Sequence, residues 1–150
     1  LRSIADIARS QGEDISTLQS RLACLEVFAF GGKSDTDDGA ETGYFTVRAV
    51  LAKAVSDAAK HIAAKGLTER GAPPIARLIS QLSSRFGTVV SEKVFAQGVP
   101  VIGALGGATI NLLFVDHFQE VARGHFAVRR LERKYGKEKV KEEYIKILSE

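Results

Sequence analysis

The residues from Val94 to Val115 form a run of 22 positions without an ionisable side chain, in a chain where 26% of the residues are charged. A helix needs about 20 consecutive apolar residues to cross the hydrocarbon core of a bilayer. Pro100 interrupts helical hydrogen bonding, which leaves about 16 residues of unbroken helix, and Asn111 adds a polar group to them. A simple membrane-spanning helix is therefore marginal, and either lipid or a protein core must cover this segment.

Three glycines follow Pro100 in this segment, at Gly103, Gly106 and Gly107. Gly103 and Gly107 are four residues apart and form a GxxxG step, with Ala104 and Ala108 beside it. Small residues at this spacing allow the backbone of a second helix to approach closely, in lipid or in water. The sequence therefore predicts tight packing of this helix against another helix.

The length of 150 residues suits one domain with a single core, and we expect residues 1–150 to form it. The chain begins with Leu1 and contains no methionine, which predicts a fragment that lacks amino-terminal helices. Cys24 is the only cysteine, so we expect a cytoplasmic, reducing location with Cys24 in a helical core. The given sequence shows no signal peptide at its start.

The charged residues give a small positive balance, with 21 Lys and Arg against 18 Asp and Glu. A nucleic-acid-binding protein concentrates basic residues on one face. Here Glu132 interrupts the basic residues Arg129, Arg130, Arg133 and Lys134, and acidic residues follow them. This pattern is typical of a solvated helix face, and we expect no nucleic acid among the partners.

Apolar residues recur at helical spacing in five segments of the chain. Asp14 is a candidate amino-terminal cap for the first segment, and Pro73 and Pro74 suit the first turn of the third. No run of β-branched residues bounded by turns alternates with polar residues. Because Gly87 allows a bend within the third segment, the sequence predicts an all-α bundle of about six helices around the Gly- and Ala-rich apolar helix. The five segments are approximately residues 15–28, 44–62, 73–95, 101–135 and 138–148.

Two motifs between residues 31 and 41 imitate ligand sites. Gly31-Gly32-Lys33-Ser34 resembles the end of a phosphate-binding P-loop, but the first glycine of that motif would fall at Val27. The acidic residues from Asp35 to Glu41 suggest a calcium loop, yet Thr46 stands where the closing glutamate of an EF-hand belongs. We interpret these motifs as a helix-terminating turn and a solvated loop, and we predict no metal or cofactor.

The region after the apolar segment holds the strongest candidates for a polar cluster. Asn111, Phe118, His125 and Glu132 are each seven residues apart and share one side of a helix. If they point inward, the polar members require hydrogen-bonding partners. Such a network fixes helix register or lines a pocket. The partners that the sequence offers are Arg85, Glu92 and Arg129.

His117 and Glu120 are three residues apart, as metal ligands on bundle helices often are. One such pair supplies too few ligands, and no second His-x-x-Glu occurs in the chain. Pairing with Arg123 is the interpretation that we favour. No Ser, Cys or Lys lies in the context of an activated nucleophile, so no catalytic residue is assigned.

Four blocks of the sequence match the pattern of a known family. They are GVPVIGALGGATINLLFVDHFQEVARGHFAVRRLERKYG at 98–136, LACLEVFAFGG at 22–32, GYFTVR at 43–48 and SSRFGTVVSEK at 83–93. With these blocks the chain resembles the EcsC protein family. The family takes its name from a bacterial operon that also encodes the ATPase and membrane subunits of an ABC transporter, and its own activity is unassigned. The resemblance implies membrane association and transfers no catalytic residue.

We therefore expect a cytoplasmic, membrane-associated helical interaction protein, peripheral at the inner face of the membrane and linked to ABC-transporter function. Its expected partners are a membrane surface, a membrane protein or a second copy of the chain. The first alternative is a hydrolase or ligand-binding protein with a buried polar or metal site around His117, Glu120 and His125. The second alternative is a soluble helical scaffold in which the apolar helix is simply central.

Overall fold

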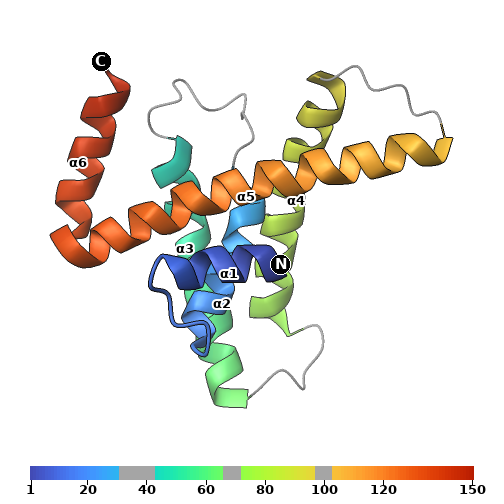
Figure 1. The fold of residues 1–150 in the computed structure, drawn as a ribbon. Coiled ribbons are helices and arrows are strands. Elements are labelled where there is room, and N and C mark those ends of the chain that lie inside the picture. The colour runs from blue at the N-terminus through green and yellow to red at the C-terminus, as the bar shows by residue number, and fades with distance from the viewer. Residues whose placement is uncertain (31–42, 66–71, 97–102) are drawn as a thin grey trace.

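The computed structural model of the chain describes residues 1–30, 43–65, 72–96 and 103–150, with the helical backbone alone for 88–96 and 103–114. Over these ranges the chain forms six α-helices and one short 3-10 helix, without a strand, which confirms the all-α bundle. The elements are α1 (Arg2–Ser10), α2 (Leu18–Glu26), η1 (Val27–Ala29), α3 (Gly43–Lys65), α4 (Pro73–Ala96), α5 (Gly103–Tyr135) and α6 (Lys137–Leu148). Figure 1 shows α5 lying across the other helices, with α6 rising from its carboxyl end.

The longest element is α5, whose 33 residues extend over about 50 Å. Phe118, Ala122 and Phe126 on α5 are at most 5% exposed. Ile4 of α1 packs in the same cluster, so the first helix of the chain lies against the second half of the longest one (Figure 1). Cys24 is buried in this cluster, as the sequence predicted.

The apolar spacing predicts no helix before residue 15, so α1 is an addition to the predicted elements. Ile4, Ile7 and Ala8 do have helical spacing, but α1 has only nine residues, too few turns for a clear period. Burial of Ile4 and Ala8 against α5 stabilises this short helix, since helices of this length are marginal without tertiary contacts.

The predicted start of α2 was wrong, because Asp14 forms a turn and does not cap the helix. Its carboxylate accepts hydrogen bonds from the backbone N–H of Ser16 (2.9 Å) and from the Ser16 hydroxyl (2.6 Å). Thr17 is the amino-terminal cap, and its hydroxyl accepts from the N–H of Ser20 at 3.3 Å. Asp and Ser compete with helix formation through such local bonds, which moves the helix start to Leu18.

Two further hydrophobic clusters join α3 to its neighbours. One joins α3 to α2 and α4, and the other joins α3 to η1 and Phe30. Ala54 and Ala58 of α3 pack with Leu78 of α4 and Leu22 of α2. Pro73 begins α4, as predicted for a residue that fixes φ and lacks an N–H. The helix α5 packs against α1 and η1, and side chains of α2 and α3 also contact it. These contacts position the polar cluster described next.

Candidate functional site

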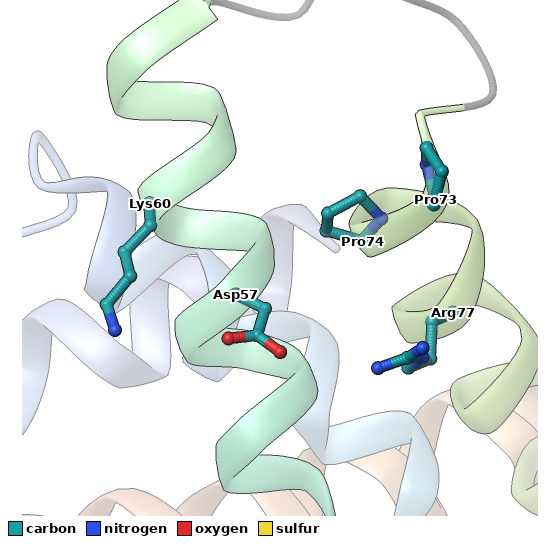
Figure 2. Close-up of a pocket in the computed structure, with 5 residues that line it drawn as sticks. All are labelled: Asp57, Lys60, Pro73, Pro74 and Arg77. Carbon is teal, nitrogen blue, oxygen red and sulfur yellow. The ribbon is translucent and has the colours of Figure 1, made fainter.

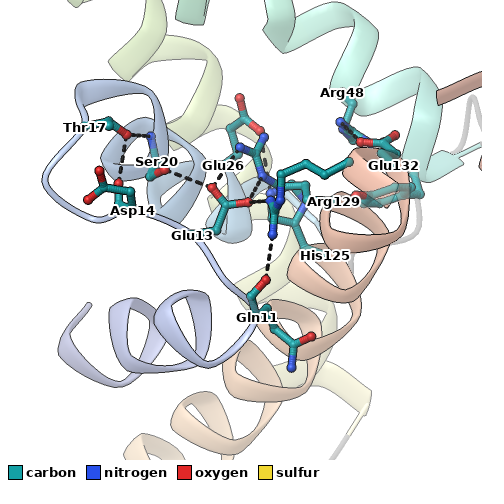
Figure 3. Close-up of polar contacts among 12 residues, drawn as sticks. Gln11, Glu13, Asp14, Thr17, Ser20, Glu26, Arg48, His125, Arg129 and Glu132 are labelled. Atoms are coloured by element: carbon teal, nitrogen blue, oxygen red, sulfur yellow. Dashed lines mark hydrogen bonds and ion pairs between the residues drawn. The ribbon is translucent and has the colours of Figure 1, made fainter. Parts of the chain in front are cut away.

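The polar candidates on α5 meet partners from three other elements of the bundle. Phe118 and His125 are buried, and the Glu132 side chain is 8% exposed, so these members of the seven-residue stripe share the inner side of α5. Asn111 belongs to the same stripe, but its side chain lies outside the described residues. Figure 3 shows His125, Arg129 and Glu132 facing residues of the α1–α2 connection, α2 and α3.

Glu13 is the centre of the first group of contacts. Its carboxylate accepts hydrogen bonds from Arg129 Nε (2.8 Å) and Nη2 (3.1 Å), from the Ser20 hydroxyl (2.9 Å) and from Arg133. Burial by itself acts to raise the pKa of Glu13, but the hydrogen bonds from Arg129 and Ser20 and the charge of Arg129 lower it to about 2. The ionised carboxylate therefore ties the connection between α1 and α2 to the last turns of α5 (Figure 3).

Arg48 and Glu132 form a second link, between α3 and α5. Arg48 donates from both terminal nitrogens to the two oxygens of Glu132, at 2.7 and 3.0 Å. This bidentate geometry is the strongest arrangement of the pair. The guanidinium also lies 5.4 Å from the ring centroid of Tyr44 and 5.9 Å from that of Phe45, so it fixes the first turns of α3 on α5.

His125 lies between these two ion pairs. Its Nδ1 is 2.9 Å from the hydroxyl of Tyr44, and its Nε2 is 3.9 Å from a carboxylate oxygen of Glu26, too far for a hydrogen bond. Burial lowers the pKa of His125 to about 3, and the charges of Arg129 and Arg48 act in the same direction. Burial also raises the pKa of Glu26. Near neutral pH the imidazole is therefore uncharged, and Nε2 has no hydrogen-bonding partner.

This cluster contains an acid, a base and a hydroxyl, yet its geometry favours a structural role. His125 is 2% exposed and Glu26 is 9% exposed, so neither can reach a substrate in solvent. Ionic and polar groups enclosed in this way define which helices pack together and in which register. The contacts span 81 to 120 residues of sequence and hold the second half of α5 in one orientation.

The other predicted site residues lie elsewhere. Glu120 is exposed, while His117 is half-buried beside Phe118 and Arg85 is half-buried on α4. Within the described part of the chain, no group of three His, Cys, Asp or Glu side chains is placed to hold a metal ion. Several predicted positions fall outside the described side chains or residues, namely Glu92, Gly103, Gly106, Gly107 and both motifs between residues 31 and 41.

Six members of the cluster were not predicted as site residues: Glu13, Ser20, Glu26, Tyr44, Arg48 and Arg133. Glu26 carried a signal, because it is a lone charge within the apolar block LACLEVFAF and burial of such a residue requires a partner. Tyr44 and Arg48 are four residues apart and share a helix face. Glu13 follows Gly12, whose φ of +81° favours glycine, and nothing local marks it as buried.

A surface recess of about 270 Å³ lies between α3 and the start of α4, apart from this cluster. Figure 2 shows Asp57, Pro74 and Arg77 facing the gap between the two helices. A helix start can bind anions through its free N–H groups, but Pro73 and Pro74 remove two of them. The recess is therefore poorly suited to phosphate or carboxylate. Its lining residues are Asp57, Lys60, Pro73, Pro74 and Arg77.

Among the helical residues that the structure describes, none forms a helix with both the length and the apolar character needed to cross a membrane. The model of the EcsC protein family matches residues 1–131, a range that includes the polar cluster up to Arg129 and stops before α6. No curated protein and no solved structure matches the chain.

Proposed function

Since this chain belongs to the EcsC protein family, whose biochemical activity is unassigned, we propose that it is a membrane-associated interaction protein. In this proposal the bundle docks on the lipid surface at the cytoplasmic face of the membrane. The contact is made by the α4–α5 apolar region, which consists of Ile79, Phe86 and the uncharged run from Val94 to Val115. The lone, buried Cys24 suits a reducing compartment.

The observation that carries the proposal is the exposure of large apolar side chains beside the uncharged run. Ile79 and Phe86 on α4 are 57% and 39% exposed, and Val115 on α5 is 40% exposed. Phe86 stacks on Phe118 of α5, with ring centroids 5.7 Å apart, so the exposed Phe86 lies beside the helical turn that contains Val115. Exposed apolar residues beside a 22-residue run without charge are typical of a surface that meets lipid or protein.

The free energy gained when lipid covers these side chains suits reversible binding at the membrane surface. Half-exposed side chains of this size gain roughly 1 kcal/mol each when lipid covers them. Three of them, with the apolar residues of the run, are enough for peripheral association. The polar cluster supports this contact, because Glu13 and Glu132 hold the second half of α5 through Arg129 and Arg48. Figure 1 shows the amino-terminal part of α5 extending past α4.

The proposed membrane contact also has a protein partner. The operon that gives the family its name also encodes an ABC transporter, and we propose a transporter of this class as the protein neighbour. The alternative of a hydrolase or ligand-binding protein has less support, because His125 is enclosed while Glu120 is exposed.

Vesicle flotation of the intact protein tests the lipid contact. We expect part of the protein to float with the vesicles, and we expect the double variant Ile79→Asp/Val115→Asp to reduce the floating fraction about tenfold, because two charges then face the lipid. The matched control is Val50→Asp, a similar change at a 51% exposed residue of α3, which should leave flotation unchanged. Equal flotation of the double variant and the control would contradict the proposal, as would a wild-type protein that stays entirely in the soluble fraction.

A further inference from the structure

A second apolar surface lies at the opposite end of α5, where this helix meets α6. The two helices join at Gly136, whose φ of +88° turns the chain sharply, and Figure 1 shows them diverging from that point. A groove of about 300 Å³ lies between them. Its apolar walls are Val128, Leu131 and Tyr135 of α5 and Val140, Tyr144 and Ile147 of α6.

Three apolar residues of this groove are open to solvent. Leu131, Tyr135 and Ile147 are 38%, 50% and 69% exposed, and Leu148 beside them is 42% exposed. Three large apolar side chains at this exposure in one groove, with Leu148 next to Ile147 in the sequence, are more than the scattered apolar residues of an ordinary surface. The groove therefore lacks the element that would cover it.

The groove is held in shape by contacts of α6 with α3. The ring of Tyr144 stacks on Tyr44 with centroids 5.9 Å apart, and it meets Phe45 edge-on at 5.2 Å. Tyr44 is in turn bonded to His125 in the polar cluster. Since α6 is fixed by these rings, a partner does not have to order it, and less conformational entropy is lost on binding.

Charges on the rim of the groove indicate the chemistry of the partner. Lys139 and Glu143 line the groove one helical turn apart on α6. An anionic lipid surface would attract Lys139 but repel Glu143. The α6 helix of a second copy of the chain, running antiparallel, pairs both charges, because Lys139 of each copy then faces Glu143 of the other. This self-complementary pair is what a two-fold interface between identical chains requires.

We propose that the groove between α5 and α6 binds α6 of a second copy of this chain. In the resulting two-fold dimer, Ile147 and Leu148 of each copy fill the groove of the other, and the Lys139–Glu143 pairs flank them. Each copy contributes at most the residues from Val128 to the end of α6, so the interface is at the small end of specific interfaces. We expect a dissociation constant in the micromolar range, on the order of 1–100 µM.

Sedimentation equilibrium of the full chain, from about 1 to about 500 µM, tests this dimer. We expect a concentration-dependent shift from monomer to dimer. Ile147→Asp should abolish the shift, and Lys139→Glu should weaken dimerisation at least tenfold because it places like charges opposite each other. The double variant Lys139→Glu/Glu143→Lys restores opposite charges and should bring the dissociation constant back to within about threefold of the wild type. Lys141→Glu, the same change at an exposed residue of α6 outside the groove lining, should have no effect.

Three results would overturn the dimer: a wild-type chain that is monomeric at every concentration, Ile147→Asp that associates like the wild type, or a charge-swapped double variant as weak as Lys139→Glu. Vesicle flotation separates this proposal from the membrane contact. If Ile147→Asp lowers flotation while the wild type stays monomeric, the groove takes lipid and the dimer is wrong. If the dimer forms and flotation is absent, the membrane proposal alone fails.

Discussion

Glu13→Ala is expected to lower the free energy of unfolding by about 3–5 kcal/mol, the cost of leaving the largely buried charge of Arg129 without its partner. Glu13 is 8% exposed, and its carboxylate is the shared acceptor of Arg129, Arg133 and Ser20. Removal of the carboxylate leaves Arg129 unpaired where its side chain is 18% exposed. Urea unfolding followed by circular dichroism measures the loss.

The matched control is Glu120→Ala, which removes the same side chain from an exposed position of α5. A surface substitution of this kind should change stability by less than about 0.5 kcal/mol. If Glu13→Ala and Glu120→Ala have similar small effects, Glu13 does not hold α5 on the bundle, and the structural role given to the polar cluster is wrong.

The second large effect concerns pH. The pKa of His125 is about 3 in the folded chain, while its ordinary value is about 6.5. Below pH 6.5 the unfolded chain binds a proton that folded His125 does not accept, so stability is full above this pH and falls as pH decreases toward 3. Between pH 7.5 and 4.5 the wild type should therefore lose about 2–3 kcal/mol more than His125→Phe, which has no group to titrate.

The comparison with His125→Phe isolates this contribution from its neighbours. The pKa of Glu26 is raised by burial, so Glu26 alone makes the fold less stable as pH rises above 4.5. The pKa of Glu13 is about 2, so its stabilisation is lost only below pH 4.5. Both contributions remain in the variant. Parallel stability profiles of the wild type and His125→Phe, measured by urea unfolding, would show that His125 is not held uncharged.

The helices from α3 to α6 could be predicted because their apolar residues repeat at 3.6-residue spacing, a local signal that needs no knowledge of the partner. Helix α1 was not predicted, because it is short and depends on burial against α5. The start of α2 was misplaced because Asp14 and Ser16 form a local turn that competes with the helix. Tertiary contacts determine whether α1 forms, and side-chain hydrogen bonds determine where α2 begins; helix propensity alone determines neither.

In the polar cluster, the residues on one helix could be predicted from their spacing, but their partners on other helices could not. The spacing of His125 and Glu132 on one helix indicated which side of α5 carries polar groups. Their partners lie far away in sequence, as in the pairs of Arg129 with Glu13 and of Glu132 with Arg48. No local pattern encodes such pairs, because they depend on how the helices cross. The groove between α5 and α6 was likewise beyond prediction, since it depends on the turn at Gly136.

Hydrogen–deuterium exchange of the intact protein, with and without lipid vesicles, tests the proposed membrane contact directly at the residues involved. We expect vesicles to slow exchange at least about tenfold in the uncharged run from Val94 to Val115, while peptides from α2, whose residues are buried in the core clusters, keep their rates. Exchange in this run that is the same with and without vesicles would contradict the proposal that lipid covers it.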